Sequence, residues 1–400
     1  MARVLILDGH SSAALAFTRS LGRAGHWIAV GSNRGLLAPA AVSRYCQCSF
    51  EYPVSTDDVA GFVDAVYEFC RNHAIAWVAP MTDWTTVPLS WHRTRFEGLS
   101  RLVLPSATAL ESASDKYRTI ELARALGVPE PKTWLVHSAP DLDTLPGLEF
   151  PVVVKDRFSA RWLENRAVLG SVSYAYSEQD LREKVEERLR EAGDVLVQEF
   201  VGGEGVGFSC FALDGEAHLP FEWLRVREVD PRGSGSSLRK SVAVDSQVRE
   251  FSQRLIRGAG FQGIAMVEFK RMPEGRLVLM EINGRPWGSI QLPISAGLDY
   301  PGYLLDWVLQ GKIPPREIPY KTGIFCRRLV GDLTHLEHLR LGKPAGWPRP
   351  YPNFWSSLVR MSVPWYPGLR YDDLWVRDPR PGLAGLRGWL QQRVGNARSR

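Results

Sequence analysis

Residues 263–289 read GIAMVEFKRMPEGRLVLMEINGRPWGS and decide the fold of the chain. Two apolar runs, at 264–269 and 276–282, flank the tetrapeptide Met-Pro-Glu-Gly at 272–275. Apolar runs of this length, separated by proline and glycine, are typical of two strands joined by a turn. The stretch therefore predicts a β-hairpin.

The spacing of polar residues in this hairpin predicts a cluster of acids on one face. A two-residue turn at 274–275 would place Glu268 directly opposite Glu281. Asn283 lies two residues beyond Glu281 and faces the same side, as does Arg285 if the strand continues.

Two glutamates that oppose each other across a hairpin repel unless something offsets their charge. A hard divalent cation would do so, because Mg²⁺ prefers carboxylate and carbonyl oxygens and often shares them with phosphates. The solvated face of an ordinary hairpin also carries glutamates. The spacing alone leaves both interpretations open.

The length of 400 residues predicts two or three domains with ample core. An apolar content of 44% and a charged content of 23% describe an ordinary globular protein. No apolar run is long enough to span a membrane, and the first one is too short for a signal peptide. The five cysteines have neither disulfide-framework nor zinc-site spacing, so we expect reduced thiols and a cytoplasmic location.

The net charge of +5 is concentrated near the C-terminus. Residues 331–400 contain eleven lysines and arginines against five acids, or +6, which leaves the rest of the chain near neutral. This distribution argues against a nucleic-acid enzyme. The same region is rich in tryptophan, and residues 383–394 predict a basic amphipathic helix. We expect the region to pack back on the body, with docking to a partner or a membrane surface as the alternative.

The first thirty residues predict a β-α-β unit of a doubly wound sheet. Residues 3–8 read as a buried strand, a helix follows to about Ala24, and residues 27–31 give the next strand. Only Gly9 stands where a dinucleotide fingerprint needs three glycines, so we expect no NAD here.

Three charged residues lie at element boundaries where ligands often bind. Asp83 follows a short strand, where it meets a ligand or caps the next turn, and the cap is the preferred interpretation. Lys116 opens a helix after Asp115, against the helix-dipole preference. Lys155 ends the apolar strand 150–155. In isolation Lys116 reads as a solvated lysine, whereas Lys155 either extends to solvent or presents its charge to phosphates.

Two polar loops offer further cations or backbone donors. Residues 156–173 contain Arg157, Arg161 and Arg166 and suit a mobile lid. The glycine-rich loop 233–237 suits an anion, or serves only as a flexible connector.

The order and approximate spacing of five segments resemble the ATP-grasp superfamily of carboxylate–amine and related ligases. No single match is decisive, but five in the family's order are specific, and they cover about residues 1–312. The matching positions are Asp115-Lys116, Val152-Val-Val-Lys155, Gln198-Glu-Phe-Val201, Val267-Glu-Phe and Met280-Glu-Ile-Asn283-Gly-Arg285.

The resemblance implies a mixed α/β and α+β fold. It places a Rossmann-like pre-ATP-grasp domain at 1–108, a two-lobed ATP-grasp domain at 109–312 and a Pro/Trp/Arg-rich extension at 313–400. The two lobes would occupy about 109–194 and 195–312.

The resemblance also implies roles for individual residues. ATP would meet two lysines at its phosphates and the strand between the lobes at its adenine, and carboxylates would hold Mg²⁺, or Mn²⁺ in its place. The implied ATP contacts are Lys116, Lys155, Gln198, Glu199, Phe200 and Val201; the implied metal ligands are Glu268, Glu281 and Asn283; and the implied catalytic residues are Lys155 and Arg285.

Two features depart from the family pattern. Val206 stands where the family often carries a ribose-binding acid, and Glu204 is the nearest acid that could replace it. The loop after Lys155 lacks the glycine-rich sequence that usually covers phosphates, so its arginines are the candidates for that role.

The family's activity implies an ATP-dependent ligase that activates a carboxylate as an acyl phosphate and transfers it to an amine, forming an amide bond. The expected partners are small-molecule carboxylate and amine substrates and no nucleic acid, and a homodimer is the other association considered. The family's substrate pocket lies between the leading domain and the second lobe. The candidate substrate contacts are Asp83, Arg225, Arg227, Arg239 and the loop 233–237.

Two other functions stay open. One is a carboxylase or carbamoyl-phosphate-type enzyme that activates bicarbonate, although no biotin-attachment or glutaminase domain is evident in the sequence. The other is a non-catalytic ATP-binding scaffold subunit, which would not need Glu268, Glu281, Asn283 and Arg285 together.

Overall fold

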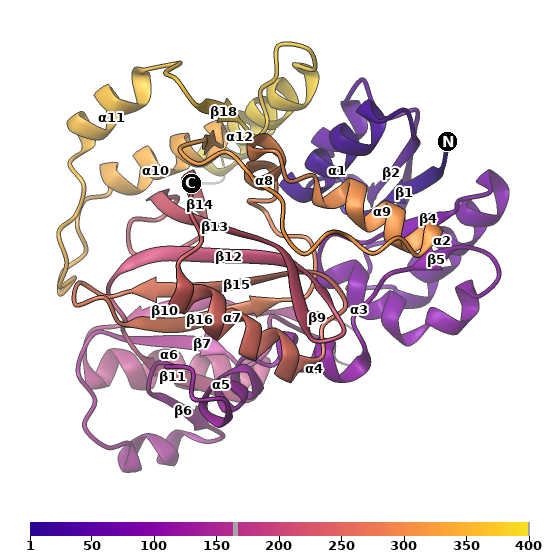
Figure 1. Cartoon of the computed structure of the whole chain (residues 1–400). Coiled ribbons are helices and arrows are strands. Elements are labelled where there is room, and N and C mark those ends of the chain that lie inside the picture. The colour runs from indigo at the N-terminus through magenta and orange to yellow at the C-terminus, as the bar shows by residue number, and fades with distance from the viewer. Residues whose placement is uncertain (163–166, 399–400) are drawn as a thin grey trace.

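The computed structural model describes residues 1–162 and 167–398, and its first sheet is parallel (Figure 1). The strand order is β3-β2-β1-β4-β5. Val4 and Ile6 of the first strand pack with the first helix, whereas Leu5 and Leu7 pack with the second, so helices cover both faces. The predicted doubly wound start is confirmed. Its elements are β1 (Arg3–Ile6), α1 (Ser12–Arg23), β2 (Trp27–Asn33), η1 (Pro39–Val42), β3 (Cys48–Tyr52), α2 (Val59–His73), β4 (Trp77–Ala79), α3 (Asp83–Trp91), η2 (Arg93–Phe96) and β5 (Arg101–Leu102).

The second sheet has four antiparallel strands in the order β10-β7-β11-β6. Leu181 and Val185 of helix α6 pack against valines of β7 and β11, which buries one face of this sheet. The predicted polar loop 156–173 contains a small hairpin, and residues 163–166 lie outside the described ranges. The elements are α4 (Ala107–Ser114), α5 (Lys116–Ala125), β6 (Thr133–Val136), η3 (Ala139–Thr144), β7 (Val152–Asp156), β8 (Ala160–Trp162), β9 (Ala167–Leu169), β10 (Val172–Ala175), α6 (Glu178–Ala192) and β11 (Val195–Glu199).

The third sheet has seven strands in the order β16-β15-β12-β13-β14-β17-β18. Alternate residues such as Val206, Phe208 and Val267 pack under α4, α5 and α7, so one face is covered by helices. The opposite face carries Glu268 and Lys270. The elements are β12 (Glu204–Leu213), β13 (Glu216–Glu228), β14 (Ser236–Val242), α7 (Ser246–Ala259), β15 (Gly263–Arg271), β16 (Leu277–Asn283), α8 (Gln291–Ala296), α9 (Tyr300–Gln310), β17 (Phe325–Arg327) and β18 (Leu369–Tyr371).

The C-terminal region packs back on the rest of the chain through buried ion pairs. Arg19 of α1 is fully buried, and its Nε donates to Asp378 Oδ2 at 2.8 Å. Arg239 of β14 pairs with the buried Asp372. No helix within the described ranges is both long and apolar enough to cross a membrane. The remaining elements are α10 (Leu329–Arg340), α11 (Phe354–Ser362) and α12 (Arg380–Arg398).

Candidate active site

The predicted hairpin forms between β15 and β16, and its two acids oppose each other. Glu268 pairs directly with Glu281 in the ladder. Asn283 Nδ2 donates to Glu281 Oε1 at 2.8 Å, so both side chains lie on the same side. The strand ends at Asn283 and does not continue to Arg285.

The turn of this hairpin differs from the prediction, and a bulge compensates for the difference. Met272 N–H donates to Arg276 O at 2.9 Å, so the loop holds three residues, 273–275, instead of two. The extra loop residue would shift the two glutamates out of register. A bulge at Met280 restores their pairing.

Glu268 is buried beside another acid and only one arginine. Burial raises the pKa of Glu268 to about 7, and Glu281 adds to this effect, although the charge of Arg225 opposes it. Arg225 reaches Glu268 from β13 and forms an ion pair with it. The path of Arg225 requires Gly205, because a Cβ there would lie 2.5 Å from Arg225 Cδ.

The donor set at the hairpin fits a divalent cation. Two carboxylates and one amide oxygen are the ligands that Mg²⁺ and Mn²⁺ accept. Arg225 pairs with Glu268, yet burial and the neighbouring Glu281 still keep the pKa of Glu268 raised. Among the described residues no three His, Cys, Asp or Glu side chains form a metal cluster, so phosphate oxygens would have to complete the coordination.

Two lysines lie close to this acid pair. Lys155 on β7 is 8% exposed, and no described residue forms a hydrogen bond or an ion pair with its ammonium group. Burial lowers the pKa of Lys155 to about 8, and the charge of Lys116 lowers it further while Glu281 opposes this. Lys116 Nζ donates to Asp156 O at 3.1 Å. Both ammonium groups therefore lie within electrostatic range of Glu281, one of the two opposed hairpin acids.

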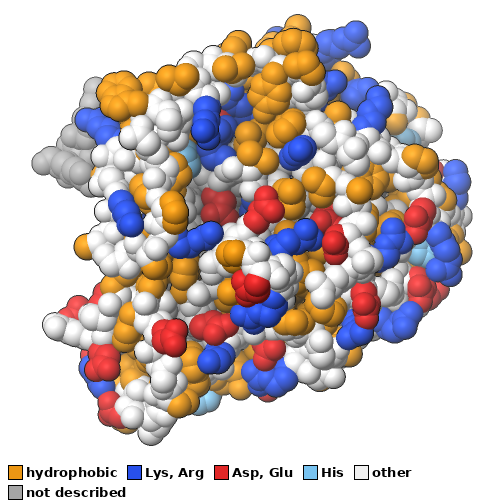
Figure 2. All heavy atoms as spheres, turned by 60° about the vertical axis from the view of Figure 1, so that its left-hand side comes forward, with side chains coloured by type: hydrophobic (Ala, Val, Ile, Leu, Met, Phe, Trp, Pro, Cys, Tyr) orange, Lys and Arg blue, Asp and Glu red, His pale blue; other side chains and the backbone are white. Residues whose placement is uncertain are grey.

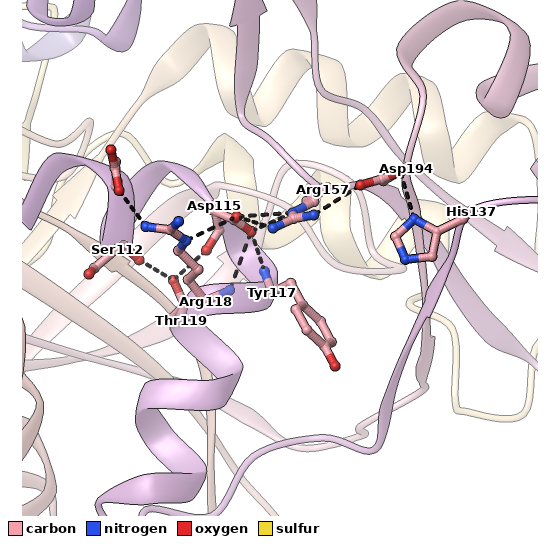
Figure 3. Close-up of polar contacts among 9 residues, drawn as sticks. Ser112, Asp115, Tyr117, Arg118, Thr119, His137, Arg157 and Asp194 are labelled. Atoms are coloured by element: carbon pink, nitrogen blue, oxygen red, sulfur yellow. Dashed lines mark hydrogen bonds and ion pairs between the residues drawn. The ribbon is translucent and has the colours of Figure 1, made fainter. Parts of the chain in front are cut away.

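Asp115 and Arg157 join the start of α5, where Lys116 lies, to the residues that follow β7; Figure 3 shows their contacts. Asp115 caps α5 by accepting from Tyr117 N–H at 3.0 Å. Arg157 Nη2 donates to Asp115 Oδ2 at 2.7 Å, and Arg157 Nη1 donates to Asp194 Oδ2 at 2.9 Å. Lys116 N–H donates to Arg157 O at 2.9 Å. Lys116, whose charge is unfavourable in the first turn of α5, is therefore held at its backbone by Arg157.

The arginines suggested for covering phosphates have different surroundings. Arg157 is engaged by two acids, whose hydrogen bonds with it raise its pKa. Arg161 lies on β8, and Arg166 lies outside the described residues.

Arg285 and Asp83 form a two-pronged ion pair between the first and third sheets. Arg285 Nε and Nη2 donate to the two oxygens of Asp83, each at 2.8 Å. Burial would raise the pKa of Asp83, but the charge of Arg285 holds it below its ordinary value. The preferred capping role of Asp83 is wrong, because Thr82 is the N-cap residue of α3.

Sequence reasoning missed Asp8, which supports Asp83 from behind. Asp8 follows β1 with a left-handed φ of 55° and is fully buried. Its Oδ2 accepts from Thr82 N–H at 2.8 Å and from Thr85 Oγ1 at 2.6 Å. A buried acid at the end of a strand was the available signal.

Residues 198–204, which join the two lobes, differ in burial and in the contacts of their side chains. Gln198 is buried and donates to Thr133 Oγ1 at 2.7 Å, so its side-chain amide is engaged within its own sheet. Glu199 is half-buried and Val201 is buried. Glu204, at the start of β12, is exposed.

A tryptophan of the C-terminal region packs beside this strand, which sequence reasoning also missed. The ring of Trp347 lies 5.0 Å from that of Phe200 and 5.4 Å from that of Tyr174. Arg349 Nη1 donates to Gly203 O at 3.3 Å. The C-terminal region therefore contacts both β10 and the connection to β12.

The candidate substrate arginines separate into two groups. Arg225 and Arg227 line a cavity on the open face of the third sheet. Arg239 is 1% exposed and is bound to Asp372, so it lies away from solvent. The loop 233–237 is an ordered connection, and Ser234 O accepts from Arg225 Nη1 at 2.7 Å.

Known proteins resemble this chain in sequence, including the region of the hairpin. A family model described as ATP-grasp in the biosynthetic pathway with Ter operon matches residues 191–328, which include the hairpin. The ribosomal protein bS6–L-glutamate ligase of Shigella boydii is 27% identical over 247 residues, covering 59% of this chain and 74% of the relative. Over residues 191–328 the chain therefore matches an ATP-grasp family, and over a longer part of its length it is similar to glutamate ligases.

Solved structures of two other enzymes share the fold at lower sequence identity. The L-amino acid ligase of Bacillus licheniformis superimposes with a TM-score of 0.57 and 16% identity, covering 78% of this chain and 74% of that one. An ADP complex of N5-carboxyaminoimidazole ribonucleotide synthetase superimposes with a TM-score of 0.62 and 14% identity, covering 90% of this chain and 95% of that one.

A second sequence relative is also described as a ligase. A probable α-L-glutamate ligase of Citrobacter koseri is 26% identical over 57% of this chain and 74% of its own length.

Proposed function

We propose that this protein is an ATP-grasp ligase that uses Mg·ATP to activate a carboxylate and joins it to an amine. The observation that carries the proposal is the buried Lys155, which has no hydrogen-bond or ion-pair partner among the described residues and lies within electrostatic range of the hairpin acid Glu281. A buried cation without a partner is costly unless a ligand supplies the opposite charge. The triphosphate of ATP has that charge. The names of the ligase relatives support the same class of reaction.

The proposed chemistry needs positioning and charge neutralisation rather than a protein nucleophile. A carboxylate oxygen attacks the γ-phosphorus of ATP, which gives an acyl phosphate and ADP. The amine nitrogen then attacks the acyl carbon, loses a proton and expels inorganic phosphate. One amide bond forms for each ATP cleaved to ADP and phosphate.

In this proposal Lys116 and Lys155 bind the phosphates, and Glu268, Glu281 and Asn283 hold Mg²⁺. The metal supplies charge neutralisation for the phosphoryl group. The backbone of Glu199 and Val201 would contact the adenine, Gln198 and Phe200 would support that strand, and Glu204 is the candidate contact for the ribose. Arg285 stabilises the transferred phosphoryl group, and Asp83 holds its guanidinium in position.

The test is a screen for ADP release by the full-length protein with Mg·ATP and pooled carboxylates and amines. We expect ADP release to depend on a carboxylate pool, and added hydroxylamine to trap the acyl group as a hydroxamate. ADP release that needs no carboxylate, or a carboxylate-dependent reaction without any hydroxamate, would contradict the acyl-phosphate route.

A further inference from the structure

Helix α11 lies at the outer edge of the molecule, where it packs against α10 (Figure 1). Ser357 and Met361, one helical turn apart, are buried on its inner side. Trp355 and Val359 are also one turn apart and lie on the opposite side of the helix. Their exposed fractions are 70% and 69%. The outer face of α11 is therefore apolar although it is exposed.

The exposed apolar surface continues into the segment that follows the helix. Val363 is 44% exposed and Trp365 is 66% exposed. Only one other tryptophan among the described residues, Trp91, is exposed. Four exposed apolar side chains within one short segment, two of them indoles, indicate an interaction surface. We call them the apolar stripe: Trp355, Val359, Val363 and Trp365.

The backbone of this segment is held in place, so its exposure is not that of a loose end. The buried Arg327 donates from Nη1 to Val363 O at 3.0 Å and from Nη2 to Met361 O at 2.6 Å. Tyr371 Oη donates to Pro364 O at 2.7 Å. The apolar stripe is therefore fixed on the outside of the fold before any partner binds.

The sequence around the apolar stripe carries positive charge only. Residues 338–371 contain five lysines and arginines and no aspartate or glutamate. Arg360 follows Val359 on α11, is exposed, and forms no hydrogen bond or ion pair with any residue that the structure describes. The same is true of Arg340 and Lys343. In the upper part of Figure 2, hydrophobic side chains lie among those of lysine and arginine. These unpaired cations complement an anionic surface.

The shape and charge of this surface favour a lipid bilayer as its partner. A twofold contact with a second copy would bring the same acid-free surfaces together, so cations would meet cations. An acidic protein would need a groove that matches an outward-projecting helix, whereas a bilayer needs no matching shape. Indole rings favour the membrane–water interface, and arginine and lysine bind anionic headgroups.

We infer that α11 and the segment up to Trp365 dock the protein on an anionic membrane surface without crossing it. The helix lies along the surface, with Trp355 and Val359 in the headgroup layer and Arg360 at the lipid phosphates. This inference does not rest on the proposed function, because no residue of the apolar stripe belongs to the hairpin cleft.

The test is co-sedimentation of the full-length protein with phosphatidylcholine vesicles, with and without about one third phosphatidylserine. We expect binding to the vesicles with phosphatidylserine to be at least about tenfold tighter, and to weaken as salt screens the charges. Failure to bind either kind of vesicle would overturn the inference. Equal binding to both would overturn the choice of an anionic surface.

Trp355→Gln locates the docking surface, and Trp91→Gln is its control because Trp91 is also exposed but lies on α3. We expect Trp355→Gln to weaken vesicle binding about tenfold, and Trp91→Gln to leave it unchanged. Neither variant should shift the urea midpoint of unfolding, since both side chains are exposed. Unaltered binding in Trp355→Gln, or equal losses in the two variants, would refute the assignment to α11.

Arg360→Gln tests the positive charge beside the stripe, and Arg101→Gln is its control because Arg101 is exposed on β5. We expect Arg360→Gln to weaken binding to phosphatidylserine vesicles about fivefold, the effect of one cation near such a surface, and Arg101→Gln to leave it unchanged. Equal losses in the two variants would refute a specific role of Arg360.

Sedimentation velocity without vesicles examines the second copy as the alternative partner. We expect the oligomeric state of the wild-type protein and of Trp355→Gln to be the same. A dimer that Trp355→Gln dissociates would assign the apolar stripe to self-association and overturn the membrane inference.

Discussion

Buried charged side chains have different partners in two regions of the protein. At the hairpin cleft, Lys155 has no hydrogen-bond or ion-pair partner among the residues that the structure describes, and Arg225 pairs with Glu268, one of the two opposed glutamates. At the junction with the C-terminal region, buried arginines meet buried aspartates, as in the pairs Arg19–Asp378 and Arg239–Asp372. Lys155 and Glu268 are nearly as buried as these pairs, whereas Glu281 is exposed, so the burial of Lys155 alone does not explain its different surroundings.

This difference in pairing distinguishes charged side chains that would bind a ligand from charged side chains that stabilise the fold. A buried ion pair is tolerated when each charge is compensated within the protein. A buried ammonium without an acid is tolerated only at a cost, which the lowered pKa of Lys155 records. The compensation at the cleft therefore has to come from outside the chain, and perturbing each region should have different consequences.

The largest expected effect is on stability at the junction. Asp378→Ala leaves the fully buried Arg19 without its acid, and removing one partner of a buried pair typically costs about 3–5 kcal/mol. Urea titration should therefore show a strongly reduced free energy of unfolding. Glu337→Ala is the control, because its pair with Arg393 is partly exposed, at 39% and 35% of the two side chains, and should be worth no more than about 1 kcal/mol.

Equal stability losses in these two variants would break the comparison, because the junction would then depend no more on buried pairs than on surface ones.

The second effect is on turnover at the cleft. Glu281→Gln removes one of the opposed charges while keeping the side-chain volume, so the hairpin should fold as before. We expect ADP release to fall by roughly 10²–10³, the usual cost of losing a transition-state electrostatic contact. Turnover is measured by ADP release, and folding by the urea midpoint. Turnover within a few-fold of wild type would remove Glu281 from the proposed metal set.

The smallest effect is a pH dependence of nucleotide binding. Burial lowers the pKa of Lys155 from 10.5 to about 8, so the free protein loses this charge as pH rises through 8. A bound phosphate would retain the proton. The dissociation constant of ATP should therefore rise about tenfold per pH unit above pH 8. Calorimetry between pH 7 and 9.5 measures it.

Lys155→Arg is the matching control, because an arginine stays charged throughout this range. Its pH dependence should be flat. Unfolding at high pH would not explain weaker ATP binding. The pKa of Lys155 is lower in the folded protein than in the unfolded chain, so the contribution of this residue to the free energy of unfolding rises between pH 8 and 10.5. A slope that persists in Lys155→Arg would assign the titration to another group.

Local patterns predicted one part of the cleft well. Glu268, Glu281 and Asn283 share a side because side chains alternate along strands, and this alternation is readable from spacing. Asp115 was recognised at a helix start and caps α5. The register of the two glutamates was predicted correctly although the turn was not, because the bulge at Met280 offset the longer loop.

Pairings between distant segments were beyond the sequence. Asp83 and Arg285 are 202 positions apart, and Arg239 and Asp372 are 133 apart. A single sequence shows each charge but not its partner, so Asp83 and Arg239 looked alike as substrate candidates. Packing decides between them: Arg239 belongs to the junction, whereas Asp83 lies beside the cleft and holds Arg285.

The pair between Arg19 and Asp378 has a consequence for biosynthesis. Its two members are 359 positions apart, and the guanidinium also donates to the carbonyl oxygens of Asp372 and Asp373. At about 5–20 residues per second, the ribosome delivers this acid roughly 20–70 s after the arginine. The first helix therefore emerges with a cation that nothing yet made can neutralise, and the N-terminal sheet can complete its packing only when translation is almost finished.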